Sequence, residues 1–374
     1  MKRFYALLAF VLLTVCPHVQ AQKVDLDRFY FDAGYLILPR EFTPPDNRTF
    51  GVRLLCSPSV ASAYPEASIY EKIGLSGFQR VENDPAVGIV VEFGNVRFEK
   101  SETKVRTEEK KDKDGKVTSK TDYYTITVRY SFSGNYKILG ARTDEKSLSR
   151  REKAKAQELQ NNRFLQGASS ADPAKSVITS GYFPYELSYT TIEYKSLTDA
   201  RRYIEQNQQT IRTDLIAKYV TDALIRVNED ANRWYGYVPT QTREFLWILD
   251  SKSHPEYPIQ QEAIKAIKEL SKRMTATQPI DQLARDIQPV MDYFQELKTK
   301  YSGSDKRDQK MRYSAFYNLM VLNFLLDRPD QASDEAVGLI KNGYDTKDGE
   351  KYIGWSEELK KMLAKHQMAS RHVQ

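Results

Sequence analysis

The sequence predicts an α+β protein: a β-rich N-terminal domain with a long charged hairpin, then an all-α C-terminal domain of antiparallel helical hairpins. Apolar residues alternate over 87–93 and again over 124–132, the spacing of strands that bury one face. After Ser196 apolar residues recur every three to four positions, the spacing of amphipathic helices. The two patterns occupy different parts of the chain, which is typical of the α+β class.

The β-rich domain is expected over 22–140. After Gly94-Asn95 the apolar residues change parity, which predicts a β-bulge at this point. The partner strand runs over 122–132, and the densely charged stretch 100–120 lies between the two strands. Asp114-Gly115 is a turn signal at the centre of this stretch, so we expect a long hairpin with a solvated tip.

The remaining boundaries follow from changes in composition. Segment 141–175 is predicted to form a charged helix and a linker, and 176–196 a β element that returns to the first sheet. The helical domain is then expected over 197–374, with a wide apolar stripe in its first helix. Pro289 is expected to kink or interrupt a later helix.

One helix pair in this domain carries a family resemblance. Residues 313–326 lead through a short turn into a second helix over 331–340. Leu319 occupies a large apolar position of the first helix, and Ala332 a small position at which the second helix crosses it closely. The segment 313–342 thus resembles one unit of the tetratricopeptide repeat. This resemblance implies helical-hairpin packing in the C-terminal part and assigns no family to the whole chain.

The first 21 residues have the layout of a secretory signal peptide. Lys2 and Arg3 precede an apolar run over 4–15. A small-residue site follows, so we expect cleavage between Ala21 and Gln22. The apolar run is shorter than the roughly twenty residues that span a bilayer. No later segment is long and apolar enough, so we expect no transmembrane segment in the mature chain.

Export sets the expected location. We favour the periplasm, with association with the outer membrane or release from the cell as alternatives. A lipoprotein anchored through Cys16 is a further alternative. Val15 stands where lipoprotein signals carry Gly, Ala or Ser, which favours cleavage after Ala21 instead. Cys56 is then the one cysteine of the mature sequence, and we expect a small buried apolar residue without a disulfide.

Charge and motifs exclude several classes of function. The chain has 56 Lys and Arg against 50 Asp and Glu, an excess too small to indicate nucleic-acid binding. It has no P-loop, no Gly-x-Gly-x-x-Gly, no His-Glu-x-x-His and no Gly-x-Ser-x-Gly. We therefore expect no cofactor, no metal and no catalytic residues. His254 is expected in a loop, and His366 and His372 near a frayed basic terminus.

Two aromatic groups are candidate binding residues. The first group is Tyr182 and Tyr185, and the second is Trp234, Tyr235 and Tyr237. Such rings stack on sugars or on apolar side chains of a protein partner, and the alternative for the second group is packing at the end of a helix.

These observations lead to a ranked set of hypotheses. The first is an exported, non-enzymatic envelope protein, a scaffold or adaptor whose helical C-terminal domain binds another envelope protein. The second is a protein that binds glycan or cell-wall polymer through exposed Tyr and Trp. This hypothesis expects Trp234 or Tyr185 to be exposed in a groove. The third is a hydrolase without a recognisable motif, which a cleft of Ser, His and Asp or of paired carboxylates around His254 would favour.

Overall fold

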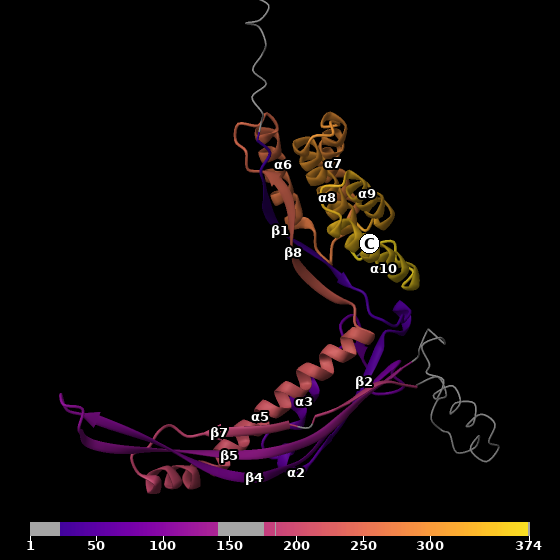
Figure 1. Ribbon diagram of the computed structural model, residues 1–374. Helices are drawn as coiled ribbons and strands as arrows, with labels where there is room; N and C mark the ends of the chain where they lie inside the picture. Colours follow the sequence, from indigo (N-terminus) through magenta and orange to yellow (C-terminus); the bar gives the residue numbers. More distant parts are fainter. Residues whose placement is uncertain (1–22, 141–175, 184, 373–374) are drawn as a thin grey trace, which may run out of the picture. The chain divides into compact units, whose positions relative to one another are not determined.

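The computed structural model describes residues 23–140, 176–183 and 185–372 (Figure 1). The chain divides into two compact units. The sheet unit is Leu38–Val238, and the helical unit combines Met1–Ile37 with Pro239–Gln374. Each unit has its own buried apolar core. The predicted α+β class is confirmed, with most strands toward the N-terminus and most helices toward the C-terminus.

The sheet unit is built on a mixed six-stranded sheet of order β3-β2-β4-β5-β6, in which β7 also pairs with β5. Its strands are β2 (Thr49–Cys56), β3 (Gln79–Arg80), β4 (Val87–Lys111), β5 (Val117–Gly140), β6 (Ser176–Tyr182) and β7 (Tyr185–Thr190). β2 runs parallel to β3 and β4, and the other pairs are antiparallel. Both strands of the segment 176–196 therefore lie beside β5.

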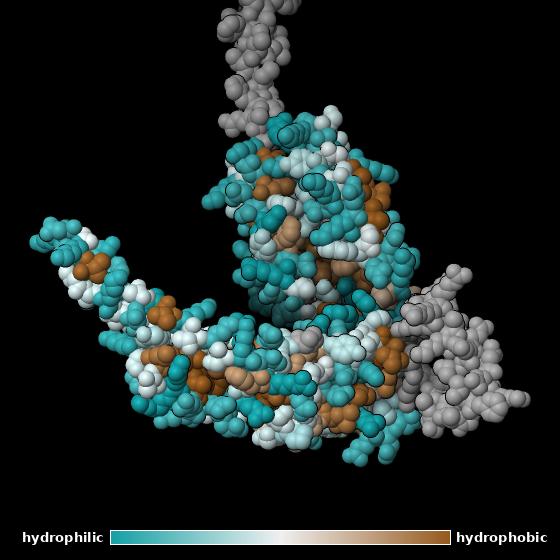
Figure 2. All heavy atoms as spheres, turned by 60° about the horizontal axis from the view of Figure 1, so that its bottom comes forward, coloured by the Kyte–Doolittle hydropathy of each residue, from teal (hydrophilic) through white to brown (hydrophobic). Residues whose placement is uncertain are grey.

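The β4–β5 hairpin confirms the predicted bulge. Phe93 pairs with Gly134 and Val96 with Phe132, so the register shifts between these two pairs. The strands also extend farther than expected, because pairing continues through the charged stretch to a turn whose Gly115 has φ +79°. Figure 2 shows this end of the hairpin as mostly hydrophilic, with isolated apolar side chains.

Helix α5 (Leu197–Trp234) lies along one face of the sheet (Figure 1). Its predicted apolar stripe is confirmed: the residues Leu215, Ile216, Tyr219, Val220, Ala223, Leu224 and Val227 are all buried. The Tyr219 ring stacks on Phe132 at 4.8 Å between centroids. The short helices α2 (Pro58–Ala61) and α3 (Glu66–Lys72) add to the same core, and η1 (Pro45–Asn47) precedes β2. The helix expected to open the helical domain therefore belongs to the core of the sheet.

The helical unit begins with a two-stranded ribbon of β1 (Leu26–Ile37) and β8 (Val238–Leu249). Its helices are α6 (Glu256–Leu270), η3 (Ser271–Arg273), α7 (Asp281–Lys300), α8 (Lys306–Leu325), α9 (Pro329–Asn342) and α10 (Lys347–Lys365). β8 corrects the expectation that everything after residue 197 is helical. It is rich in β-branched and aromatic residues, and its partner strand lies at the other end of the chain. α7 continues through Pro289 without a break.

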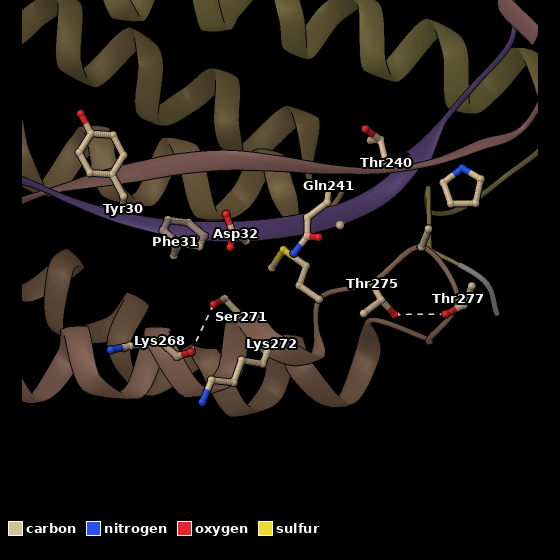
Figure 3. Close-up of a pocket in the computed structure, with 14 residues that line it drawn as sticks. Tyr30, Phe31, Asp32, Thr240, Gln241, Lys268, Ser271, Lys272, Thr275 and Thr277 are labelled. Carbon is tan, nitrogen blue, oxygen red and sulfur yellow. Dashed lines mark hydrogen bonds between the residues drawn. The ribbon is translucent and has the colours of Figure 1, made fainter.

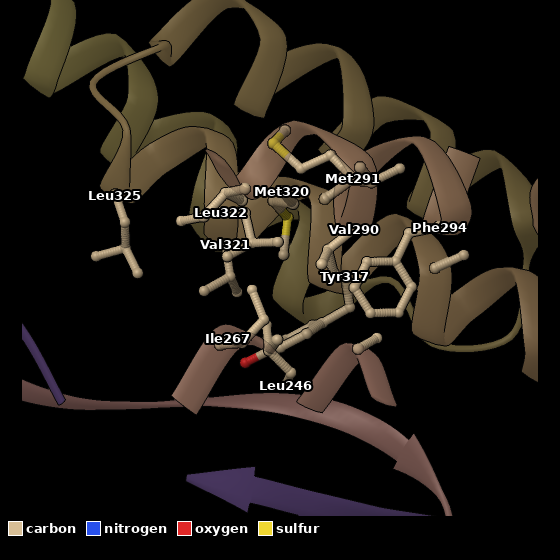
Figure 4. Close-up of a cluster of buried hydrophobic side chains, with 14 of the residues drawn as sticks. Leu246, Ile267, Val290, Met291, Phe294, Tyr317, Met320, Val321, Leu322 and Leu325 are labelled. Carbon is tan, nitrogen blue, oxygen red and sulfur yellow. The ribbon is translucent and has the colours of Figure 1, made fainter. Parts of the chain in front are cut away.

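Side chains from the ribbon and from helices α6 to α10 fill the core of the helical unit. Figure 4 shows Leu246 of β8 beside Ile267 of α6, with Phe294 of α7 and Met320 of α8 in the same cluster. α8 and α9 form the helical hairpin expected from the tetratricopeptide resemblance. Ala332 is fully buried there.

Several predictions concern residues that the structure does not describe. The signal peptide, its cleavage site at Ala21–Gln22 and Cys16 lie outside the described residues, as does the charged helix and linker over 141–175. Among the helices described, none combines the length and the apolar character needed to cross a membrane.

Candidate functional site

The predicted binding aromatics do not form one site. Tyr182 is 76% exposed at the end of β6, and Tyr185 is 40% exposed at the start of β7. The Tyr185 ring lies 6.4 Å from that of Tyr219 on α5. Trp234 follows about 22 Å farther along this helix, at 1.5 Å per residue. The two aromatic groups are therefore separated by much of the length of α5.

The second aromatic group packs at the end of α5. Tyr235 and Tyr237 are 1% and 4% exposed, so neither offers a ring face to a ligand. The Arg48 guanidinium lies 3.7 Å from the ring centroid of Tyr237. Trp234 is half-buried, with the Arg40 guanidinium 5.1 Å from its ring centroid. Tyr182 and Tyr185 thus remain the more accessible pair.

His254 lies in a buried polar cluster at the start of α6. It is 3% exposed, and its Nδ1 accepts a hydrogen bond from the Glu256 N–H at 3.2 Å. Its ring lies 5.7 Å from that of Tyr301. Burial lowers the pKa of His254, which favours the neutral imidazole. Through this bond and the backbone bonds of His254 with Ser251 and Tyr257, the histidine holds the first turn of α6.

The Glu256 carboxylate is the centre of this cluster. It is 1% exposed and accepts hydrogen bonds from Tyr293 Oη at 2.9 Å and Tyr301 Oη at 3.2 Å. Lys300 Nζ lies 2.6 Å from the same carboxylate. Burial alone raises the pKa of Glu256, but the hydrogen bonds from Lys300 and the tyrosines outweigh it, and the net pKa lies below its usual value. The cluster therefore ties the start of α6 to the end of α7.

The expectation of a frayed basic terminus is wrong. His366 and His372 are 2% and 1% exposed. The Asp327 carboxylate accepts hydrogen bonds from Ser370 Oγ at 2.8 Å and from Arg371 Nε at 2.6 Å. Asp327 lies in the turn between α8 and α9 and has φ +54°. A carboxylate in this turn thus fixes the chain after α10, which the basic composition of that segment does not reveal.

Where the structure describes them, Cys56 and the acidic side chains form no cluster of metal ligands. Within the described ranges, no group of three or more His, Cys, Asp or Glu could hold a metal ion. Cys56 is half-buried, and burial raises the pKa of its thiol to about 11. The thiol is therefore protonated at neutral pH and a weak nucleophile.

An open groove of about 570 Å³ lies in the helical unit, between β1 and the C-terminal end of α6 (Figure 3). Polar side chains line much of it: Thr240, Gln241, Ser271, Thr275 and Thr277. Phe31 and Met274 add apolar surface. Most of the lining surface is nevertheless apolar, so the groove suits a ligand that has apolar groups together with a few donors and acceptors.

The groove adjoins the edge of β1 that faces away from β8. Along this edge the Gly34 N–H donates to Met274 O at 2.8 Å, and the Leu36 N–H donates to Arg371 O at 2.9 Å. Backbone groups of alternate residues point the same way along a strand, so those of Asp32 and Tyr30 face the same side. Both residues line the groove.

Gly34 allows the close approach that ends the groove. A Cβ at this position would lie 3.0 Å from Met274 O and 3.2 Å from Thr275 Cα. Both are backbone atoms, which yield less easily than the end of a flexible side chain. Gly34 therefore lets the loop after η3 hydrogen-bond to the strand.

Charged side chains surround the opening of the groove. Lys268 and Lys272 come from α6 and η3, and in Figure 3 the Lys272 ammonium points away from the strands whereas that of Lys268 points to the side. Lys272 pairs with the exposed Glu269 at 2.6 Å. Asp32 supplies a carboxylate from the opposite wall. Lys268 thus gives the helix side of the opening a positive charge.

No family model, no curated protein and no solved structure matches this chain.

Sequence reasoning missed the groove. Its walls come from β1 and from β8 and the end of α6, and β1 is far in sequence from the other two. The β-branched and aromatic residues of 238–249 could have revealed β8, and the hydroxyl-rich stretch 271–277 could have marked a polar loop. Neither signal indicates that the two segments meet at β1.

Proposed function

We propose that this chain is a non-enzymatic, exported envelope protein that binds another protein through its helical unit. The observation that carries the proposal is the groove beside the outer edge of β1. A groove between a strand edge and a helix suits a protein segment, because the edge supplies backbone hydrogen bonds and the walls supply side-chain contacts. The periplasmic location belongs to the same proposal and depends on the first 21 residues.

Photocrosslinking in cells that export the full chain tests this proposal. A benzoylphenylalanine at Gln241 would stand in the groove, and one at Glu357, exposed on α10, is the control. We expect a discrete adduct from position 241 that is absent from position 357. Equal labelling at the two positions, or no adduct at 241, would reject protein binding through this groove.

Glycan binding is a second candidate, supported by the 76% exposure of Tyr182 and the 40% exposure of Tyr185. Exposed rings of this kind stack on the apolar faces of sugars. Titration of the full chain with soluble cell-wall glycan fragments tests it. Binding that Tyr182→Ala weakens would support this candidate, and binding unchanged by that substitution would count against it.

A further inference from the structure

We infer that the ligand of the groove is an extended peptide of the partner that adds to β1 as a third strand and places an acidic side chain near Lys268. This inference rests on the proposed function and names the chemistry of the partner.

Part of this edge of β1 already makes the backbone hydrogen bonds that a third strand would make. Two segments distant in sequence accept hydrogen bonds from Gly34 and Leu36, through Met274 O and Arg371 O. The next outward-facing residues along β1 are Asp32 and Tyr30, and both line the groove. Gly34 is already bonded to Met274 O, so the part of this edge left for a ligand runs from Tyr30 to Asp32 and is about 7 Å long at roughly 3.3 Å per residue. That length accommodates a short extended peptide whose amides continue the pattern.

The walls restrict the ligand to a narrow chain. Ser271 and Thr275 stand across the groove from β1, and Gln241 reaches it from β8 (Figure 3). Their hydroxyl and amide groups can bond to peptide groups that face away from the strand edge. A volume of about 570 Å³ is large enough for a few residues of an extended chain and too small for a helix with its side chains.

The charges favour an acidic side chain on the helix side. Lys272 is partly neutralised by Glu269, whereas Lys268 has no ion pair among the described residues. On the strand side, Asp32 disfavours a second carboxylate close to β1. A peptide with an acidic residue directed at α6 and a neutral residue at β1 fits both constraints.

Peptide selection and charge reversal test the side-chain part of the inference. Random dodecapeptides displayed on phage are selected against the full chain, and an enriched peptide is synthesised. We expect an acidic residue within an extended, Gly-poor and Pro-poor sequence. Lys268→Glu should weaken binding at least tenfold. Lys265→Glu, an equal charge change on the same helix outside the groove, should leave it unchanged. Equal effects of the two substitutions would overturn the charge assignment.

Alternate N-methylation of the same peptide tests strand addition without altering the protein. Methyl groups on one set of alternate amides should abolish binding, because those amides face β1, while methyl groups on the other set should be tolerated. Tolerance of both sets would overturn strand addition. If the adduct at Gln241 still forms in that case, protein binding stands and the inference alone fails. If selection enriches no saturable peptide, the inference also fails, and the adduct decides separately whether the proposed function stands.

Discussion

Glu256 is a buried carboxylate whose three charged or polar partners come from one neighbouring helix and the residue that follows it. Transfer of a carboxylate from water to a protein interior costs several kcal/mol, and incomplete pairing does not compensate for that cost. Tyr293, Lys300 and Tyr301 supply the donors, and all three lie near the end of α7 or just beyond it. The lowered pKa of Glu256 indicates that this pairing outweighs burial. The surroundings of Glu256 therefore stabilise the charged carboxylate more than the neutral acid.

Replacement of Glu256 by Gln should destabilise the helical unit. The amide keeps the shape but offers one acceptor oxygen without charge, which leaves Lys300 and one tyrosine poorly paired. We expect the free energy of unfolding to fall by about 2–4 kcal/mol. Denaturant unfolding followed by circular dichroism measures the change. Glu269→Gln, at an exposed ion pair on α6, is the control and should have no measurable effect.

Acidification should destabilise the protein in two steps through this cluster. Burial lowers the pKa of His254, so below about pH 6.5 the unfolded chain binds a proton that the folded chain does not. Stability therefore falls as the pH falls through this range. Glu256 contributes in the same direction at lower pH, because its stabilisation is lost as the carboxylate becomes protonated below the unfolded pKa near 4.5.

One buried acid acts in the opposite direction. Burial raises the pKa of Glu335 even though Lys298 lies 2.8 Å away, so its protonation favours the folded state.

Because the two effects oppose each other, the test compares variants. Between pH 7 and pH 5.5 the thermal midpoint of His254→Asn should change less with pH than that of the unmodified chain. Identical pH profiles for the two proteins would contradict the assignment to His254.

Two asparagines near the end of α5 hold the segment that follows α3. The Asn232 side chain accepts a hydrogen bond from the Ser76 N–H at 2.8 Å and donates to Gly74 O at 3.3 Å. Asn228 accepts from the Gly74 N–H at 3.0 Å and donates to Lys72 O at 2.8 Å. The turn after α3 thus has side-chain partners from α5 in place of regular backbone pairing.

Asn232→Ala should destabilise the sheet unit by about 1–3 kcal/mol, because the Ser76 N–H and Gly74 O lose their partner in a half-buried site. Hydrogen exchange of the Ser76 amide reports the local effect, and thermal unfolding the global one. Gln208→Ala on an exposed part of the same helix controls for helix propensity. Unchanged exchange at Ser76 would show that the side chain does not hold this turn.

The end of the β4–β5 hairpin makes little contribution to the core of the sheet unit. Residues 108–120 are exposed, and the ion pair of Glu109 with Lys120 is solvated, which limits its contribution to stability. Nearer the sheet, the bidentate contact of Arg106 with Glu193, at 2.7 Å for both bonds, fixes the hairpin to the segment after β7. Beyond Arg106 the hairpin therefore contributes little to holding the sheet unit together.

Replacement of residues 108–121 by a two-residue Asn-Gly turn should leave the thermal midpoint of the full chain almost unchanged. The turn type matches the twist of a two-stranded hairpin, and the shortened arm retains the contact of Arg106. A large loss of stability would show that the distal hairpin supports the core. Unchanged stability with lost binding would instead assign a binding role to the arm.

At the level of elements, the sequence predicts what depends on near neighbours. The parity shift at Gly94-Asn95 and the stripe through Tyr219 are local periodicities, and both appear in the structure as a bulge and a buried helix face. The pairing of β1 with β8 and the parallel pairing of β2 with β4 join distant segments, and periodicity carries no register between them. The groove depends on the first of these pairings, and for that reason the sequence did not predict it.

At the scale of the whole molecule, the order of elements in sequence differs from their grouping in space. The predicted change from strands to helices at residue 197 lies inside the sheet unit, because α5 covers the sheet. The helical unit is formed by two separate stretches, and the ribbon of β1 and β8 joins them. Leu38–Val238 is thus a continuous segment with its own core.

This grouping predicts which fragments fold. Residues 38–238 contain all strands of the sheet and the helix that covers it, so this fragment should unfold cooperatively and keep the slow exchange of Val91 and Ile138, both buried at 0% exposure. Residues 197–374 lack β1 and therefore lose Phe31 and Ala33 from their core. They also expose the apolar face of α5, so we expect this fragment to aggregate. Calorimetry and hydrogen exchange of the two fragments check the prediction. A cooperative transition in 197–374 and none in 38–238 would favour the boundary drawn from sequence periodicity, because α5 would then fold with the helices and not with the sheet.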